Sequence, residues 1–204
     1  MLKIAVTGGA GSGKTSVCSR LKALGLEVIS ADDAAKQAAV PGSEALEKIA
    51  GTFGKKILLP DGSLNRKMLR QIIMEDDAAR KNLESILHHE ISNLILKNVV
   101  QLEKEDRPMV VIEVPLLFEL DLQSQYDRVV VVSASREPRI QRLMARDSIS
   151  RASAERLINL QMPDAKKIEG ADYVVRNEGS EADLINSVDV LFENLSNMAT
   201  KKSS

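Results

Sequence analysis

The feature that most constrains this chain is a glycine-rich stretch near its start, Gly8-Gly9-Ala10-Gly11-Ser12-Gly13-Lys14-Thr15. It matches the pattern G-x-x-x-x-G-K-[ST], in which backbone N–H groups cradle phosphates. The apolar residues before it predict a buried strand, and Val17, Leu21 and Leu24 after it have helical spacing. Because a strand, a loop and a helix follow in this order, the sequence predicts a phosphate-binding loop rather than a surface turn that carries a lysine.

The residues of this loop have separate predicted roles. Glycines let the backbone approach a polyphosphate without a Cβ clash, and N–H groups at the start of the helix point toward phosphate oxygens. Lys14 is predicted to reach the β- and γ-phosphates, and Thr15 to offer its hydroxyl to Mg²⁺. The predicted nucleotide contacts in this segment are Gly8, Gly11, Ser12, Gly13, Lys14, Thr15 and Ser16.

Composition narrows the classes of function that such a loop could serve. The chain has 204 residues, a formal net charge of -1 and 2% aromatic residues, so nucleic-acid binding is not favoured. The single cysteine, Cys18, excludes an intramolecular disulfide and is expected to be a buried packing residue. The chain has no apolar run of membrane-spanning length and no signal-peptide layout, which predicts a soluble, cytoplasmic protein without an obligate protein partner.

Strands and helices alternate along the chain. Short apolar runs predict five strands, at Leu2–Thr7, Leu26–Ser30, Met109–Val114, Arg128–Val132 and Ala171–Val175. This alternation favours an α/β fold with a mostly parallel, five-stranded sheet, in the three-layer arrangement of P-loop NTPases. Ligands of such sheets bind at the carboxyl ends of the strands, where the glycine-rich loop, Asp32, Asp33 and Glu113 would lie.

Two helical segments interrupt the alternation. The first is predicted at residues 33–105, is too long for a simple crossover, and includes a helix Glu44–Gly54 capped by Ser43. The second is an arginine-rich helical pair at residues 136–162. We expect the first to be an acceptor-binding subdomain and the second to be a lid.

The remaining residues make up the predicted nucleotide-binding core, which comprises 1–32, 106–135 and 163–204. Within the insertion, further helices are expected at about Leu64–Ile73 and Ala78–Glu105. A final helix is expected from about Glu181 to Leu195, and the tail Lys201–Ser204 is expected to be disordered.

A phosphate-binding loop does not by itself specify a reaction. The chain lacks the Asn-Lys-x-Asp motif by which GTPases read their base, and its third strand ends in Glu113-Val114-Pro115 rather than the Asp-Glu of mechanical ATPases. A helical insertion and a lid fit a small-molecule kinase, which must exclude the water that would compete for the γ-phosphoryl group.

Three arginines of the predicted lid, Arg139, Arg142 and Arg146, occur at positions i, i+3 and i+7 and share one face of a helix. Like charges on one face repel each other unless anions lie opposite, which favours a contact with phosphate. The alternative is a solvated face balanced by the neighbouring carboxylates Glu137, Asp147 and Glu155.

The candidate acid and base groups have alternatives too. Asp32 and Asp33 follow the second strand directly, where an acidic residue is most often a helix N-cap, and Asp33 could serve only in that way. His88 lies on the long helix, where a histidine is more often a surface or partly buried polar residue than a functional one.

Taken together, these motifs resemble the dephospho-coenzyme A kinase family over nearly the whole chain. The most specific match outside the loop is Val114-Pro115-Leu116-Leu117-Phe118-Glu119, which is present unchanged. The other matching segments are Val6–Lys14, Val28–Asp32, Leu64–Arg66, Ile86–His89, Gln161 with Lys167, and Ala171–Gly179. The chain departs from the family pattern where Ser30 and Asn65 each replace an acid and where His89 replaces a proline.

The resemblance implies ATP-dependent phosphorylation of the ribose 3′-hydroxyl of dephospho-coenzyme A, the last step of coenzyme A biosynthesis. It implies that Asp32 aligns the acceptor hydroxyl, while Lys14 and Arg142 act on the transferring group. The implied acceptor contacts are Asp32, Arg66, His88 and Leu117. The implied nucleotide contacts outside the loop are Arg139, Arg146, Asn177 and Gly179.

Two alternatives remain open from the residues alone. A nucleoside monophosphate kinase would share the loop, the lid and the chemistry, and would differ in the acceptor it prefers. A nucleotide-sensing switch without turnover would differ by releasing no ADP, and the intact Asp32 and arginine-rich lid argue against it. The sequence specifies neither the oligomeric state nor the selectivity for the nucleotide donor.

Overall fold

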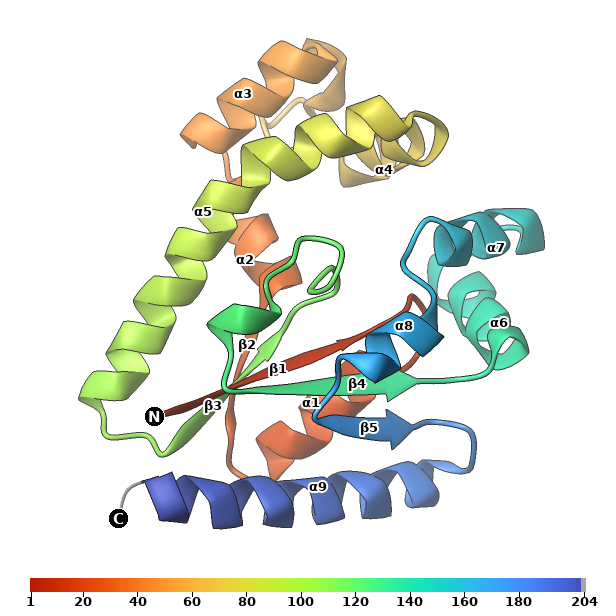
Figure 1. The fold of residues 1–204 in the computed structure, drawn as a ribbon. Coiled ribbons are helices and arrows are strands. Elements are labelled where there is room, and N and C mark those ends of the chain that lie inside the picture. Colours follow the sequence, from red (N-terminus) through yellow and green to blue (C-terminus); the bar gives the residue numbers. More distant parts are fainter. Residues whose placement is uncertain (203–204) are drawn as a thin grey trace. The chain divides into compact units, whose positions relative to one another are not determined.

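All strands belong to one parallel sheet in the order β2-β3-β1-β4-β5, in a computed structural model that describes residues 1–202 (Figure 1). The strands are β1 Leu2–Gly8, β2 Glu27–Ser30, β3 Met109–Glu113, β4 Arg128–Ser133 and β5 Tyr173–Arg176. In the register of the sheet, Val6 of β1 lies between Glu113 of β3 and Val130 of β4. The predicted fold class is therefore confirmed, and the phosphate-binding loop leaves the central strand.

The chain divides into two compact units. One contains Met1–Ser30 and the segment from Leu102 onward, and the other contains Ala31–Gln101. The first unit holds the whole sheet, whereas the second is helical. The finer division into core, acceptor subdomain and lid remains a prediction.

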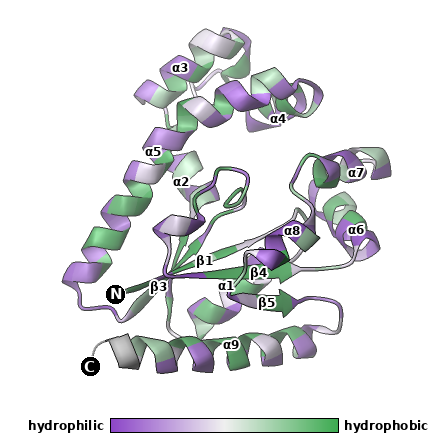
Figure 2. Cartoon of the chain, viewed as in Figure 1, coloured by the Kyte–Doolittle hydropathy of each residue, from purple (hydrophilic) through white to green (hydrophobic). Residues whose placement is uncertain are grey.

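The sheet is buried on both faces, as the apolar strand sequences predict. Ile4 and Ala5 point to opposite faces, and both are fully buried. The helices α1 Lys14–Ala23 and α9 Glu181–Lys202 contact each other and bury their apolar residues in one cluster with the strands. Figure 2 shows the strands as hydrophobic, whereas α9 alternates along its length between hydrophobic and hydrophilic residues.

The rest of the first unit follows β3 and β4. Its helical elements are η2 Gln123–Gln125, α6 Arg136–Asp147, α7 Arg151–Asn159 and α8 Asp164–Glu169. The helices α6 and α7 form the predicted helical pair and pack around a small apolar cluster of their own, formed by Ile140, Leu143, Ala154 and Ile158. This pair, with the segment that leads from it to α8, is called the lid segment below.

The second unit contains the helices of the predicted insertion. They are α2 Ala31–Ala38, α3 Glu44–Phe53, η1 Lys55–Ile57, α4 Arg66–Glu75 and most of α5 Asp77–Lys104. Leu46, Ile49, Ile57 and Leu69 are buried in its separate core. This unit therefore has an apolar core of its own, as expected for a subdomain.

Helix caps account for where two of these helices begin. The Ser43 hydroxyl accepts a hydrogen bond from the Leu46 N–H at 3.2 Å, which confirms the predicted cap of α3. The α4 helix begins at Arg66 rather than at the predicted Leu64, because Asn65 Oδ1 accepts from the Met68 N–H at 3.1 Å and caps the helix. The Asn65 amide thus has a local structural role at the position where the family pattern has an acid.

The last helix is longer than the sequence predicts. It continues past Leu195 to Lys202, so the predicted disorder of Lys201–Ser204 is wrong at Lys201 and Lys202, while Ser203 and Ser204 lie outside the described residues. Leu195 and Ala199 are buried on this continuation, which explains why it stays helical. None of the helices formed by residues 1–202 combines the length and apolar character that crossing a membrane requires.

Candidate active site

The phosphate-binding loop connects β1 to α1 and depends on glycine at three positions with positive φ, Gly8, Gly11 and Gly13. Gly11 and Gly13 have φ values of +75° and +99°, in the left-handed region where other residues are strained. A Cβ atom on Gly13 would also collide with the Asn177 side chain, and one on Gly11 would lie 2.6 Å from the Arg139 carbonyl oxygen. Gly13, which the motif requires, and Gly11, at one of the motif's variable positions, are therefore needed for both backbone conformation and close packing.

The N-terminus of α1, which carries the positive end of the helix dipole, is suited to bind an anion. Gly13 is the N-cap and provides no side-chain hydrogen bond, and the first turn carries no acidic residue. The backbone N–H groups of a first helical turn have no carbonyl partner inside the helix, so this end favours negative charge. The Ser12 hydroxyl, fully buried beside these groups, makes no hydrogen bond within the protein. These features fit a polyphosphate.

Lys14 lies across the loop in this structure. Its ammonium donates hydrogen bonds to the carbonyl oxygens of Gly8 at 3.0 Å and of Gly9 at 3.2 Å. The lysine charge is thereby placed over the first residues of the loop. Thr15 and Ser16 follow in the first helical turn with exposed side chains, so the Thr15 hydroxyl is accessible to a metal. In the described part of the chain, no group of three His, Cys, Asp or Glu residues could hold a metal ion alone.

Asn177, just after β5, is hydrogen-bonded to the backbone of the loop. Its Nδ2 donates to the Ser12 carbonyl oxygen at 2.9 Å, and its backbone N–H donates to the Ser133 carbonyl oxygen at 2.8 Å. The residue is buried, with 7% of its surface exposed. The structure therefore ties Asn177 to the loop backbone, whereas its predicted contact with adenine, like that of the exposed Gly179, remains a prediction.

Arg142 lies on the carbonyl side of the loop. Its guanidinium donates to the carbonyl oxygens of Gly11 at 3.3 Å and Ser12 at 3.4 Å, and to that of Asn177 at 3.2 Å. The side chain is half-buried. Among the three predicted lid arginines, Arg142 both contacts the loop and keeps part of its own side chain exposed to solvent.

The other two arginines of the predicted face have different environments. Arg139 is buried, with a side chain 7% exposed, and its guanidinium pairs with Asp164 at 3.0 Å and donates to the Ala10 carbonyl oxygen at 2.8 Å. Arg146 is exposed and pairs with the neighbouring Asp147 at 2.8 Å. A direct contact of Arg139 with nucleotide is disfavoured by this arrangement, because the anion that offsets its charge is a carboxylate of the protein.

Three further polar contacts join the lid segment and α8 to the rest of the first unit, and sequence patterns predicted none of them. Gln161 Oε1 accepts a hydrogen bond from the Ala10 N–H at 2.6 Å. The ammonium of Lys167 lies 2.8 Å from Glu119 Oε1, and the same oxygen accepts from the Met162 N–H at 3.0 Å. The only signal for them was that Glu119, Gln161 and Lys167 occur in segments matching the family pattern.

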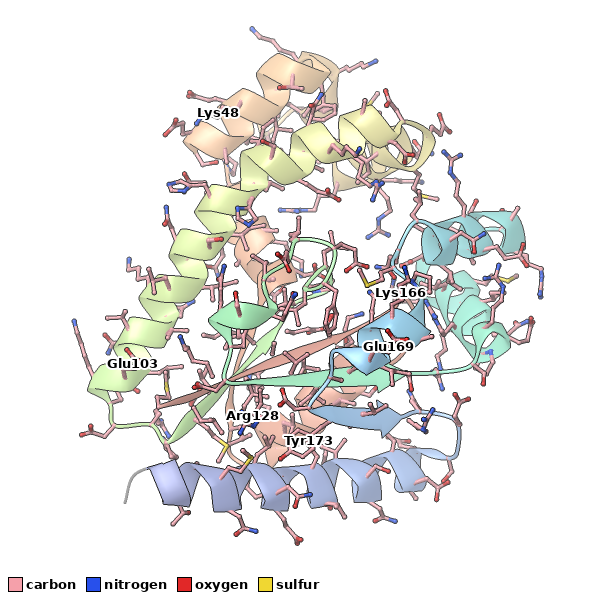
Figure 3. The ribbon with its side chains drawn as sticks, in the orientation of Figure 1. Lys48, Glu103, Arg128, Lys166, Glu169 and Tyr173 are labelled. Atoms are coloured by element: carbon pink, nitrogen blue, oxygen red, sulfur yellow. The ribbon has the colours of Figure 1, made fainter. Side chains whose placement is uncertain are left out.

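Lys167 differs from the residue before it on α8. Lys167 is fully buried, whereas Lys166 is exposed and appears at the surface of α8 in Figure 3. Leu117, in the segment between β3 and β4, is also fully buried. Its predicted contact with the acceptor has no support in this structure, because no part of its side chain is accessible.

The remaining predicted residues belong to the second unit. Asp32 and Asp33 are both exposed in the first turn of α2, and Asp33 pairs with Lys36 one turn later. The expected N-cap role of Asp33 is wrong, because the helix begins at Ala31 and Asp33 lies inside it. Arg66 donates to the Lys36 carbonyl oxygen at 3.2 Å. His88 is exposed on α5. The approach of these residues to the loop remains a prediction.

A phosphate loop on the central parallel strand, with an arginine-bearing lid segment folded against it, defines a P-loop kinase of the small-molecule class. The comparisons with known proteins narrow that class. The dephospho-CoA kinase family model matches residues 2–183, so the chain belongs to the dephospho-CoA kinase family.

Individual relatives are similar to this chain over most of its length. A dephospho-CoA kinase from Syntrophotalea carbinolica is 42% identical over 180 residues, which cover 88% of this chain and 85% of that protein. A crystal structure from Thermus thermophilus is 30% identical, with a TM-score of 0.78 over 95% of this chain and 97% of the other. A dephospho-CoA kinase structure from Campylobacter jejuni is 28% identical, with a TM-score of 0.70 over 96% and 97% of the two chains.

Proposed function

We propose that this chain transfers the γ-phosphoryl group of ATP to the ribose 3′-hydroxyl of dephospho-coenzyme A, giving coenzyme A and ADP. The observation that carries the proposal is the phosphate loop itself, held against the arginine-bearing lid segment within one unit. Membership of the dephospho-CoA kinase family supports the choice of acceptor. A cytoplasmic location, expected from the sequence, is part of the proposal.

The loop and the start of α1 bind and orient the phosphates. The backbone N–H groups of the first helical turn and the dipole of α1 favour the phosphate charge. Lys14 lies over Gly8 and Gly9, and with nucleotide bound its ammonium would exchange these carbonyl partners for β- and γ-phosphate oxygens. Mg²⁺, when bound, neutralises charge on these phosphates, and Thr15 would hold it through its hydroxyl.

Two side chains act on the reacting groups, one on the transferring phosphoryl group and one on the acceptor hydroxyl. Arg142 is half-buried beside the loop and is the arginine placed to meet charge on the transferring group. Asp32, exposed at the start of α2, accepts the hydrogen bond of the acceptor hydroxyl and aligns it for in-line attack. Arg66 and His88 then contact the acceptor from the same unit.

A panel of acceptors tests this proposal. ADP release would be measured with ATP and Mg²⁺ and with dephospho-coenzyme A, AMP, CMP, UMP or pantothenate as acceptor. We expect turnover with dephospho-coenzyme A to exceed that with each other acceptor by at least about a hundredfold, because an acceptor site built for one polar substrate rejects analogues that leave its groups unpaired. Preference for a nucleoside monophosphate, or no ADP release with any acceptor, would refute it.

A further inference from the structure

The lid segment holds one residue of the phosphate loop, Ala10, from three sides. Its N–H donates to Gln161 Oε1 at 2.6 Å, and its carbonyl oxygen accepts from Arg139 Nε at 2.8 Å. Its methyl group packs against the apolar cluster of α6 and α7. Arg139 lies at the start of the lid segment and Gln161 near its end, so the two ends of the segment meet at a single residue of the loop.

The Arg139 side chain is held in place by an ion pair with another residue of the first unit. Arg139 is buried and paired with Asp164, which is the first residue of α8 and follows soon after Gln161. Gly9 makes room for the pair, because a Cβ atom there would lie 2.7 Å from Arg139 Cζ and 2.8 Å from Asp164 Oδ1. A buried pair of this kind is costly to break, so it fixes the guanidinium against the loop.

Ala10 lies at the functionally sensitive end of the loop. The Lys14 ammonium contacts the carbonyl oxygens of Gly8 and Gly9, immediately before Ala10. Because this lysine reaches the β- and γ-phosphates in loops of this kind, the segment Gly8–Ala10 is the part of the loop nearest to the group that is transferred. A displacement of even about 1 Å at such a point is costly for transfer.

We propose that Ala10 is the point at which the lid segment positions the phosphate loop, with Gln161 and Arg139 as positioning residues for phosphoryl transfer. Gln161 holds the Ala10 N–H, and Arg139 holds the opposite side of the same residue. Neither residue touches the substrate in this role. The effect on turnover rests on the proposed kinase function, whereas the contact itself does not.

The test compares two glutamines of the lid segment. Gln161→Met keeps the length of the side chain and removes its oxygen acceptor, and Gln161→Glu keeps an acceptor oxygen. Gln141→Met is the matched control, because Gln141 is exposed on α6 and its side-chain amide donates to Glu137 rather than to the loop. For each variant, the exchange rate of the Ala10 amide hydrogen would be measured by NMR without nucleotide, together with kcat, the KM for the acceptor and the melting temperature.

We expect Gln161→Met to speed exchange of the Ala10 amide by about tenfold or more and to lower kcat by about tenfold, the effect of one lost hydrogen bond. The KM for dephospho-coenzyme A should change less than twofold, the melting temperature should stay within about 6 °C of the control, and Gln161→Glu should restore slow exchange.

The proposal is overturned if the Ala10 amide exchanges at the wild-type rate in Gln161→Met, if Gln141→Met has the same effect, or if kcat is unchanged while exchange quickens. Failure of the kinase function is a separate result: wild-type protein would then release no ADP with dephospho-coenzyme A, and the amide exchange rates would still test the contact.

Discussion

The ammonium of Lys167 lies 2.8 Å from Glu119 Oε1, and the lysine has no solvent exposure at all. The pair joins α8 to the segment that follows β3, and the same carboxylate accepts a hydrogen bond from the Met162 backbone. Glu119 Oε2 is buried without a hydrogen bond. Removal of the lysine would therefore leave a buried carboxylate with one backbone partner and no opposite charge.

We expect Lys167→Met to lower the free energy of unfolding by about 3–5 kcal/mol, the cost of stranding one member of a buried ion pair. The double variant Lys167→Met with Glu119→Gln should recover a large part of that loss, because the glutamine is neutral and still accepts from Met162. Urea unfolding measures both, with Lys166→Met as the exposed control on the same helix. Equal stability of the single variants at positions 166 and 167 would contradict the role of the pair.

Sequence patterns predicted the structural features that depend only on residues close together in the chain. The strand, glycine loop and helix at the start of the chain, and the Ser43 cap of α3, follow from local spacing and backbone chemistry. The Asn65 cap of α4 also depends only on local chemistry, because the asparagine side chain accepts a hydrogen bond from the N–H three residues later. The family pattern does not indicate this cap, since it marks the position only by the acid that is absent.

Contacts between distant segments could not be predicted in the same way. The spacing of Arg139, Arg142 and Arg146 indicated that anions lie opposite them, but spacing does not identify the anion. Arg146 pairs with the adjacent Asp147, one of the carboxylates that the solvated-face alternative includes. For Arg139 the anion is instead Asp164, which only the tertiary fold brings near. Similarly, Gln161 meets a residue 151 positions earlier in the chain, and only the tertiary fold brings the two together.

The Cys18 thiol should make stability depend on pH in the alkaline range. Burial, and secondarily the nearby Glu113 carboxylate, raise the pKa of this thiol from its usual 9.0 to about 12. Between these values the unfolded chain loses the thiol proton while the native protein keeps it, so the free energy of unfolding falls as the pH rises. Below pH 9 this contribution to stability is fully present.

Urea unfolding at several pH values between about 8 and 11 measures this effect, and Cys18→Ala should remove the part of the slope that comes from the thiol. In native protein at pH 8, Cys18 should also resist alkylation by iodoacetamide, because the thiolate is the reactive form. Rapid alkylation of native protein would show that the thiol is neither buried nor protonated as the structure indicates.

Lys14→Ala should abolish turnover and weaken ATP binding together. The ammonium meets non-bridging oxygens in the ground state and in the transition state, so both lose a favourable charge. The loss of such a contact commonly costs about a hundredfold in rate. Lys22→Ala is the control, because Lys22 is exposed later on the same helix. If Lys14→Ala retains more than about a tenth of the turnover, Lys14 does not bind the phosphates.

Arg142→Ala should lower kcat by about a hundredfold and raise the KM for ATP much less, as expected for a group that acts once the lid has closed. The structure also supplies a competing explanation, because Arg142 donates to the carbonyl oxygens of Gly11, Ser12 and Asn177. If its only role is to support the loop, kcat should be unchanged while the affinity for ATP and the melting temperature fall. Arg136→Ala, at an exposed arginine of α6, is the control.

The adjacent carboxylates Asp32 and Asp33 separate the proposed chemistry from local structure. Both lie in the first turn of α2, and residues that follow one another on a helix point in different directions. Asp33 is already paired with Lys36, which leaves Asp32 as the carboxylate for the acceptor hydroxyl. Asp32→Asn keeps the shape and removes the charge, and it should lower kcat by about 10²–10⁴, the range for a positioned base.

The affinity for ATP should barely change in Asp32→Asn, because the loop holds the phosphates. Asp33→Asn loses an exposed ion pair and some favourable charge at a helix start, so stability should fall by less than about 1 kcal/mol and kcat should stay within a few-fold of wild type. The measurements are kcat at saturating acceptor and the Kd for ATP in both variants. An inactive Asp33→Asn with an active Asp32→Asn would place the family match one residue out of register. If both variants keep full activity, the acceptor hydroxyl is aligned by another group, and the mechanism proposed for Asp32 fails.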